Sequence, residues 1–439
     1  MSWKNKFKQE VLSCLKQEKE YDSKRYYSID IQDKSMDIKE IFLSYKSSFK
    51  IYFQNNETKK FVSHFHAIVS FTKNELENLK VHQLVNELLE SKLNLYYCSR
   101  YYKEQTIDSD WKNIPENQFV IPRLEFLETK MDKVLRFTFK GSEVAKLGEI
   151  IDSIIFQFDK QNTNNSNPII LSQKYFPDKI NWKQMVTSVK NLINQGSYDK
   201  IVLARKLEIS YSDEINSEII FEKLTLANPK AYNFFYRIEN KDFFGASPEL
   251  LFNRDGRSVK SDALAGTRKI SINEDENNII ADELLNNQKD KLEQKIVRDE
   301  IERRLNKVCN NLSVSKTRIK RLKYLLHIHN EIEGDLNDSV SDLELINLLH
   351  PTPAVGTLPN LNTDIIFDLE KWDRGMYAAP IGFISKDKSE IVVGIRTAFK
   401  IDKKLFIFTG AGIVSESDAE SEWTEINNKM QNFIKIIKK

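Results

Sequence analysis

The most restrictive feature of the chain is that strand-like segments follow one another without a helix between them. Residues 231–239 (AYNFFYRIE) lead directly to 243–252 (FFGASPELLF), and residues 391–399 (IVVGIRTAF) lead to 404–410 (KLFIFTG). A parallel α/β fold alternates each strand with a helix, and such runs exclude that simple alternation. We therefore predict an α+β fold with mainly antiparallel sheets flanked by helices.

Helices are predicted where apolar residues recur at helical spacing. Residues 182–195 show this spacing, and Gly196 is placed to end the helix. A long helix is predicted over about 277–311. A last helix is expected to begin near Ser417, because Ser417 and Glu420 have the spacing of a capping box.

Composition narrows the class of protein. In 439 residues, 66 Lys and Arg nearly balance 64 Asp and Glu, so the basic excess of a nucleic-acid-binding protein is missing. The polar start MSWKNKFKQE lacks the apolar core of a secretory signal, and no stretch approaches the roughly 18 apolar residues of a membrane span. Three scattered cysteines form no metal-ligand pattern. We expect a cytoplasmic protein without a nucleic-acid or membrane partner.

The N-terminal third carries no chemical motif and is expected to act as scaffold. Leu135, Phe137 and Phe139 alternate there as in a half-buried strand. Residues 161–168 (QNTNNSNP) are polar and end in proline, which is typical of an exposed loop. Such a loop permits a domain boundary but does not prove one.

Two acidic pairs are candidates for a metal site. Asp290 and Glu293 are three residues apart in one predicted helix, as are Glu422 and Glu425 in another, so each pair shares a helix face. Four carboxylates would suit a hard cation such as Mg²⁺, which prefers oxygen ligands. In a chain this charged, a solvated helix face is the commoner explanation for either pair alone.

Other candidates point to an anionic ligand. Lys429 lies four residues after Glu425, where it could reach an anion or form a surface salt bridge. Gly410, near the start of TGAGIVSESD, and Gly266-Thr267 would let the backbone approach a ligand, although ordinary turns explain them equally well.

Charged residues within predicted strands form a third group. Arg396 lies among apolar residues and needs a partner, which could be a substrate carboxylate or a structural ion pair. Lys200 and Glu249 are charged residues at strand ends. The residues alone indicate an anion-binding metal enzyme and nothing more specific.

A series of longer motifs is more informative. In order along the chain these are YDKIVLAR, FFGASPELLF, DALAGTR, LLNNQKDKLEQKIV, LLHIHNEIEG, LLHPTPAVGTLP, WDRGMYAAPIGF, GIRTAF and TGAGIVSESDAESEWTEINNKM. They span about residues 200–430, and this part of the chain resembles the chorismate-utilising enzymes, which include isochorismate, salicylate, anthranilate and aminodeoxychorismate synthases.

The resemblance implies one large domain over residues 1–439, in which two antiparallel sheets pack together and are flanked by helices. It argues against a domain boundary at Asn164. Within that domain we expect a scaffold-rich N-terminal part, residues 1–170, and a motif-bearing catalytic part, residues 180–436.

Branch-specific positions favour isochorismate synthase, an isomerase. Lys200 matches the lysine with which isochorismate and salicylate synthases activate water, where ammonia-using relatives have glutamine. Ala265 replaces the nucleophilic lysine of many aminodeoxychorismate synthases. Ala354 stands where salicylate synthases usually have threonine. Thr357 departs from the family, which usually has glycine there.

The resemblance also implies site roles for chorismate and Mg²⁺. Lys200 would be the catalytic base and Glu249 the acid, and burial favours the neutral form of both. The implied metal ligands are Glu293 and Glu425, with Asp290 and Glu422 acting through water. The implied substrate-binding residues are Gly266, Thr267, His327, Ala354, Tyr377, Arg396, Gly410 and Lys429.

Three alternatives stay open. A salicylate synthase would also eliminate pyruvate, an anthranilate-type subunit would need a glutaminase partner, and a binding protein could keep the fold without catalysis. We expect a monomer without an obligatory glutaminase subunit. Isochorismate feeds menaquinone, siderophore or salicylate pathways, and menaquinone is our expectation.

Overall fold

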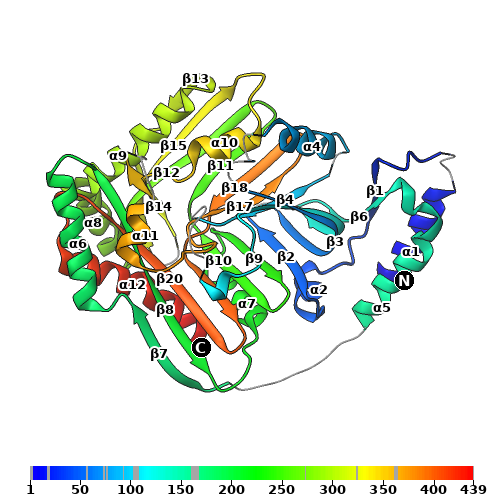
Figure 1. Cartoon of the computed structure of the whole chain (residues 1–439), viewed down its shortest axis with the longest axis horizontal. Helices are drawn as coiled ribbons and strands as arrows, with labels where there is room; N and C mark the ends of the chain where they lie inside the picture. Colours follow the sequence, from blue (N-terminus) through cyan, green and yellow to red (C-terminus); the bar gives the residue numbers. More distant parts are fainter. Residues whose placement is uncertain are drawn as a thin grey trace.

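The structure is a computed structural model. It describes residues 3–16, 20–55, 58–72, 75, 78–91, 93–101, 108–159, 168–271, 273–322, 325–359 and 364–438. Figure 1 shows the chain from its N-terminal helices to the C-terminal helix. No helix in these ranges is both long and apolar enough to cross a membrane.

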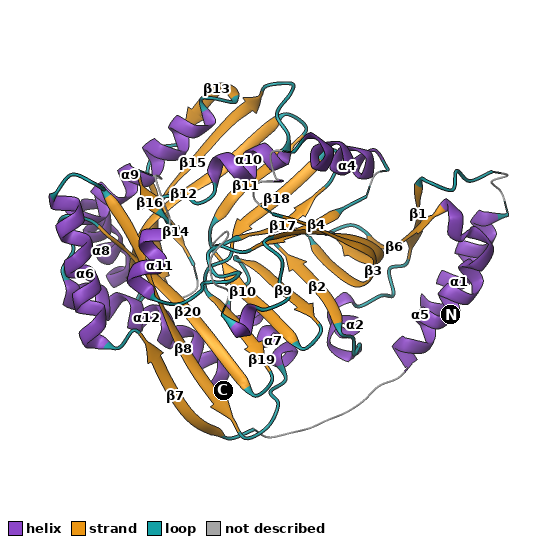
Figure 2. Cartoon of the chain, viewed as in Figure 1, coloured by secondary structure: helices purple, strands orange, loops and turns teal. Residues whose placement is uncertain are grey.

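The strands form a continuous sheet that folds over into two half-sheets (Figures 1 and 2). Every strand pair of the described residues is antiparallel, as predicted. The first half-sheet contains, in order of pairing, β7 (Ile170–Phe176), β8 (Lys200–Tyr211), β20 (Lys404–Ile413), β19 (Thr397–Ile401), β10 (Lys241–Ser247), β9 (Tyr232–Ile238), β2 (Phe49–Gln54) and β3 (Lys59–Phe71).

The strand β5 (Asn117–Glu128) connects the two half-sheets, because it pairs with both β3 and β4. It also pairs with β6 (Lys133–Lys140), which pairs with β1 (Tyr26–Gln32). The second half-sheet contains β4 (Leu95–Ser99), β17 (Pro380–Ile384), β18 (Lys388–Val393), β11 (Leu250–Asp255), β12 (Ser258–Lys269) and β15 (Leu325–Leu336), with β13 (Cys309–Val314) and β14 (Arg318–Arg321) beside β15.

Helices cover the outer faces of the sheets. α12 packs on β20 and on α6 and α7, while α8 and α9 pack on β12 and β15. The helices are α1 (Trp3–Leu15), α2 (Ile38–Ser44), α4 (Leu79–Glu90), α5 (Leu147–Asp159), α6 (Lys179–Asn194), α7 (Ser217–Ala227), α8 (Glu274–Asn286), α9 (Gln288–Leu305), α10 (Asp342–Leu349), α11 (Asp364–Glu370) and α12 (Ala419–Lys438).

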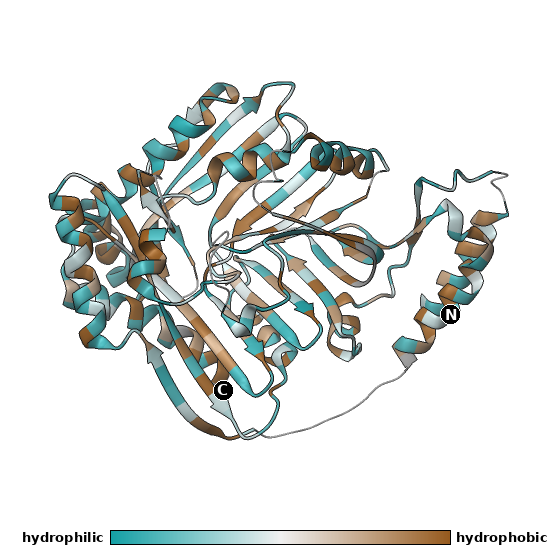
Figure 3. Cartoon of the chain, viewed as in Figure 1, coloured by the Kyte–Doolittle hydropathy of each residue, from teal (hydrophilic) through white to brown (hydrophobic). Residues whose placement is uncertain are grey.

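Two large apolar cores hold these layers together. One includes Trp111, Phe243 and Val392, and therefore joins both half-sheets. The other includes Phe42, Phe244 and residues of α1, α5, α7 and α12 beneath the helices. In Figure 3 apolar residues concentrate on the strands, whereas the helices alternate polar and apolar positions, as elements buried on one face do.

Several local predictions are confirmed. α6 buries Trp182, Met185, Val186 and Val189 on one face, and Gly196 follows it with a φ of 74°. Leu135, Phe137 and Phe139 are buried in β6. The predicted loop 161–168 lies, apart from Pro168, outside the described residues, and the division into residues 1–170 and 180–436 stays a prediction.

The predicted single helix over 277–311 is wrong. Asn287 adopts an extended backbone and ends α8, and its side chain accepts a hydrogen bond from the Asp290 backbone N–H at the start of α9. An asparagine that caps the following helix in this way separates the two helices. The chain then enters β13 at Cys309, where the sequence had suggested continued helix.

Two further boundaries differ from prediction. Asp418 caps α12 by accepting from the Ser421 backbone N–H at 2.9 Å, so the predicted capping box at Ser417 does not form. The predicted strand over 391–399 is interrupted after Val393, because the backbone of Gly394 bonds instead to Ala378 and Ala379.

Candidate active site

A cavity of about 130 Å³ opens where β8, β12, β15 and β20 meet the helices α9 and α12. Most of the residues singled out in the sequence contribute to its wall. They are Glu249, Gly266, Thr267, Glu293, His327, Ala354, Tyr377, Arg396, Gly410, Glu425 and Lys429.

The other three lie next to this cavity. Lys200 reaches two wall residues, Glu293 and Gly412. Asp290 and Glu422 line an adjoining hollow that shares Thr267, Glu425 and Lys429 with the cavity. Thr357, the departure from the family pattern, is fully buried in β16 (Thr357–Leu358), which pairs with β8, and it is not part of the wall.

Lys200 is a fully buried cation at the start of β8. Its Nζ lies 2.9 Å from Oε1 of Glu293, which comes from α9. Gly412 on β20 makes this approach possible, because a Cβ there would lie 2.4 Å from that same oxygen and 2.5 Å from Cε of Lys200. Any side chain at position 412 would therefore disrupt the ion pair.

Glu249 is a buried carboxyl between β10 and β11. Its Oε1 accepts a hydrogen bond from the Thr352 hydroxyl at 3.4 Å. Burial, reinforced by the negative charge of Asp262, raises the pKa of Glu249 to about 7, against the opposing effect of Lys200. The carboxyl can therefore hold a proton near neutral pH and release it to a substrate, which is the property of a general acid.

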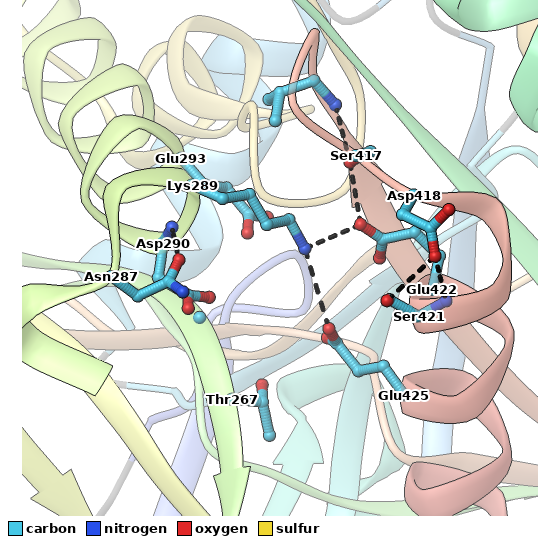
Figure 4. A network of polar contacts seen from close by, with 12 residues as sticks. Thr267, Asn287, Lys289, Asp290, Glu293, Ser417, Asp418, Ser421, Glu422 and Glu425 are labelled. Atoms are coloured by element: carbon cyan, nitrogen blue, oxygen red, sulfur yellow. Dashed lines mark hydrogen bonds and ion pairs between the residues drawn. The ribbon is translucent and has the colours of Figure 1, made fainter. Parts of the chain in front are cut away.

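The two acidic pairs converge, together with Lys289, into what we call the acidic cluster (Figure 4). Its carboxylates are those of Asp290, Glu293, Glu422 and Glu425. The Lys289 ammonium lies between the two α12 carboxylates, 2.7 Å from Glu422 Oε1 and 3.9 Å from Glu425 Oε2.

Other cations also contact the acidic cluster. Lys429 lies 2.8 Å from Glu425, on the same face of α12 as the spacing predicts, and Arg268 lies 2.6 Å from Asp290. Burial raises the pKa of Asp290, against Arg268. For Glu293 burial is outweighed by Lys200 and Lys289, which hold its pKa below its usual value.

The acidic cluster has the chemistry of a site for a hard cation. Asp290 Oδ1 and Glu422 Oε2 are buried without a hydrogen-bond partner among the described residues, and burial raises the pKa of Glu422 against Lys289. Buried oxygens with spare lone pairs suit Mg²⁺. Within the described ranges, however, no three His, Cys, Asp or Glu side chains lie close enough to hold an ion as they stand.

His327 and Arg396 form a second polar contact in the cavity. Burial, together with the charge of Arg396, lowers the pKa of His327 well below its usual value, so the ring is neutral. Its Nε2 then accepts from Arg396 Nη2 at 2.5 Å, and its Nδ1–H donates to Gly266 O at 3.0 Å. Arg396 has a φ of 52° and pairs with no carboxylate of the described residues, so its charge is available to an anion.

Two glycines within strands, Gly266 in β12 and Gly410 in β20, help to form the wall. Gly266 has a φ of 64°, which a residue with a side chain rarely adopts. At Gly410 a Cβ would lie 2.9 Å from the Tyr377 hydroxyl, and the Gly410 carbonyl accepts from Lys429 Nζ at 2.9 Å.

Sequence reasoning missed three charged residues here. Lys289 and Arg268 look like ordinary surface cations, because their carboxylate partners are distant in sequence or on another element. Arg374 is fully buried, pairs with Glu370, and donates to the carbonyls of Val202 and Val355 at 2.9 Å. Its position inside WDRGMY was the only available signal.

Two curated proteins with similar sequences are isochorismate synthases. The chain is 32% identical over 335 residues to the isochorismate synthase MenF of Bacillus subtilis, covering 75% of this chain and 71% of that one. It is 29% identical over 362 residues to the chloroplastic isochorismate synthase of Catharanthus roseus, spanning 79% of this chain but only 62% of the relative.

The fold has a close match among solved structures. The menaquinone-specific isochorismate synthase MenF from Escherichia coli superposes with a TM-score of 0.85 at 23% identity, over 98% of each chain. The family model described as chorismate binding enzyme matches residues 2–438. Together with the identity to the Bacillus relative, this match means that the chain belongs to the chorismate-binding enzyme family.

Proposed function

We propose that this protein is a magnesium-dependent isochorismate synthase, which isomerises chorismate by adding water at carbon 2 and expelling the carbon 4 hydroxyl. The observation that carries the proposal is a buried lysine, Lys200, and a buried protonatable carboxyl, Glu249, at one cavity. The names of the two curated relatives support the same activity.

The reaction needs a proton removed at one point and supplied at another. Lys200 would take a proton from water as its oxygen bonds to carbon 2 and the ring double bonds shift. Glu249 would give a proton to the carbon 4 hydroxyl, which leaves as water. A base and an acid fixed by the protein address the weakness of water as a nucleophile and of hydroxide as a leaving group.

Lys200 must lose its own proton before it can act as the base. In the structure its Nζ forms an ion pair with Glu293. Any event that turns Glu293 away from Lys200 favours the neutral amine, because the buried ammonium then lacks its counter-charge. The ion pair is therefore the resting state of the base in this proposal.

The acidic cluster would hold the magnesium ion. Glu293 and Glu425 would bind it directly, and Asp290 and Glu422 through water. When bound, Mg²⁺ would neutralise the ring carboxylate of chorismate and fix its position. Arg396, Tyr377, Lys429 and the backbone at Gly410 would hold the substrate's carboxylates, with Gly266, Thr267, His327 and Ala354 shaping the pocket.

The proposal also covers the metabolic pathway, the cellular location and the oligomeric state of the protein. The Bacillus and Escherichia proteins are both named MenF, and the latter is described as menaquinone-specific, so we propose a menaquinone-related role. We further propose that the protein is a cytoplasmic monomer. It would work without a glutaminase subunit, because water and not ammonia is the nucleophile.

Product analysis tests the reaction. Purified protein with chorismate and Mg²⁺ should form isochorismate without glutamine or ammonia, and excess chelator should stop turnover. Release of pyruvate with salicylate would assign the protein to the salicylate synthases instead. No product under these conditions would favour a binding protein that keeps the fold.

A further inference from the structure

We infer that the Lys289 ammonium is a built-in counter-ion of the acidic cluster, which a divalent cation must displace before the site can load. The inference rests on the proposed metal site and adds a residue that opposes loading. Lys289 would thereby set how much free cation the protein needs.

Lys289 is the cation that contacts both α12 carboxylates of this cluster. Glu293 is paired with Lys200, Glu425 with Lys429 and Asp290 with Arg268. Glu422, which is almost completely buried, has Lys289 as its ion-pair partner among the described residues, and its second oxygen stays without a hydrogen bond. Removing Lys289 would therefore leave a buried carboxylate uncompensated.

The position of Lys289 in its helix supports a role outside that helix. It is the second residue of α9, two residues after the cap Asn287. The first turn of a helix carries partial positive charge, so a lysine is unfavourable there and acidic residues are preferred. The benefit of a lysine at this position must come from the carboxylates that surround it, as Figure 4 shows.

A metal ion and Lys289 cannot share these oxygens. Lys289 Nζ lies 2.7 Å from Glu422 Oε1 and 3.9 Å from Glu425 Oε2, so it occupies the space in which a cation bound to both carboxylates would lie. It must therefore move away when a dication arrives. A path is available, because the side chain is 22% exposed and borders the adjoining hollow.

The first test measures binding of Mg²⁺ alone by calorimetry, in the absence of chorismate. Lys289→Gln should bind Mg²⁺ at least about tenfold more tightly than the natural protein, since one close competing charge is removed. Lys291→Gln is the matched control, because Lys291 is exposed on the same helix and contacts no carboxylate of the described residues. Its affinity should be unchanged.

The outcomes separate the two proposals. If the natural protein binds Mg²⁺ and Lys289→Gln binds it equally or more weakly, the counter-ion role is wrong and the metal site stands. If neither protein binds Mg²⁺, the metal site itself is wrong. Tighter binding by Lys289→Gln should also appear as a larger rise in its melting temperature when Mg²⁺ is added.

A second test needs no variant, in case Lys289→Gln does not fold. An amine-reactive reagent is applied to the natural protein in chelator and in Mg²⁺, and labelled peptides are quantified by mass spectrometry. Lys289 should be labelled several-fold faster with Mg²⁺, relative to Lys291. An unchanged or slower rate in a protein that binds Mg²⁺ would mean that Lys289 is not displaced.

Discussion

Two buried groups of charged residues in this molecule differ in how completely they are paired. The first, which we call the structural cluster, consists of Lys50, Glu218, Arg237 and Asp242. Arg237 contacts Asp242 at 2.5 Å and Glu218 at 2.8 Å, and Lys50 contacts Glu218 at 3.2 Å. The acidic cluster instead keeps buried carboxylate oxygens without partners.

The pKa shifts follow the same division. In the structural cluster burial is outweighed by Arg237 and Lys50, and the pKa of Glu218 falls to about 2. In the acidic cluster burial wins for Asp290 and Glu422, whose pKa values rise, whereas Lys200 and Lys289 hold the pKa of Glu293 below its usual value. Complete pairing is typical of buried charges that stabilise the fold. Buried oxygens without partners and raised pKa values are instead typical of sites that bind a ligand.

The strongest test of this contrast is Lys200→Ala. If Lys200 is the base, kcat should fall by about 10²–10⁴-fold, while binding of chorismate changes little. Product chromatography gives the rate, and equilibrium binding gives the affinity. Lys206→Ala, on the same strand and outside the cavity wall, should keep its activity. Near-normal turnover by Lys200→Ala would remove the proposed base.

The converse test is Arg237→Ala in the structural cluster. It leaves two buried carboxylates without their shared partner, so the free energy of unfolding should fall by about 3–5 kcal/mol. Because none of the four residues lines the cavity, the kcat of the folded protein should be unchanged. Urea unfolding and a rate assay on the same sample measure both. A loss of kcat without a loss of stability would contradict the division.

The sequence predicts some parts of the two clusters and not others. Spacing of three residues puts Asp290 beside Glu293, and Glu422 beside Glu425, on their helix faces, because helix geometry is local. Lys289 could not be assigned, because its partner Glu422 comes from a helix more than a hundred residues later.

The backbone around the site was also only partly predictable. Alternation predicted one strand over 391–399, but Arg396 has a positive φ and interrupts it. Residues other than glycine rarely adopt a positive φ, so the sequence does not indicate this interruption. The break at Asn287 was missed, because asparagine occurs both within helices and at their caps. Antiparallel architecture was predictable, because strand succession is visible in the sequence itself.

Glu249→Gln tests whether burial of an acidic side chain at the cavity lowers the free energy of unfolding. The pKa of Glu249 is 4.5 when unfolded and about 7 when folded, so the folded state binds more protons between these values. The contribution of Glu249 to the free energy of unfolding is therefore fully present below pH 4.5. It is lost as the pH rises through 7, a change of about 3 kcal/mol.

Glutamine cannot ionise, so Glu249→Gln should gain about this amount relative to the natural protein between pH 4.5 and pH 8. Urea unfolding across that range measures the difference. Glu218→Gln is a control with the opposite sign, because the pKa of Glu218 is lowered in the folded protein. The free energy of unfolding of this variant should fall most at neutral pH. A pH-independent difference for Glu249→Gln would mean that the carboxyl is ionised throughout.

The smallest expected effect is that of Arg396→Ala. Its guanidinium has His327 as a hydrogen-bond partner and no carboxylate among the described residues, while burial lowers its pKa to about 10, against the effect of Glu249. We propose that a substrate carboxylate completes this contact. Loss of one charged hydrogen bond, about 1.5 kcal/mol, should raise KM about tenfold. Alanine keeps a Cβ, so the backbone strain at positive φ is the same in both proteins and the melting temperature should change little.

Arg396→Lys, which keeps the charge but not the planar fork of the guanidinium, should have a KM between those of the natural protein and Arg396→Ala. If Arg396→Ala instead melts early and binds chorismate normally at low temperature, Arg396 belongs with the residues that hold the fold, and the contrast between the clusters does not extend to this side of the cavity.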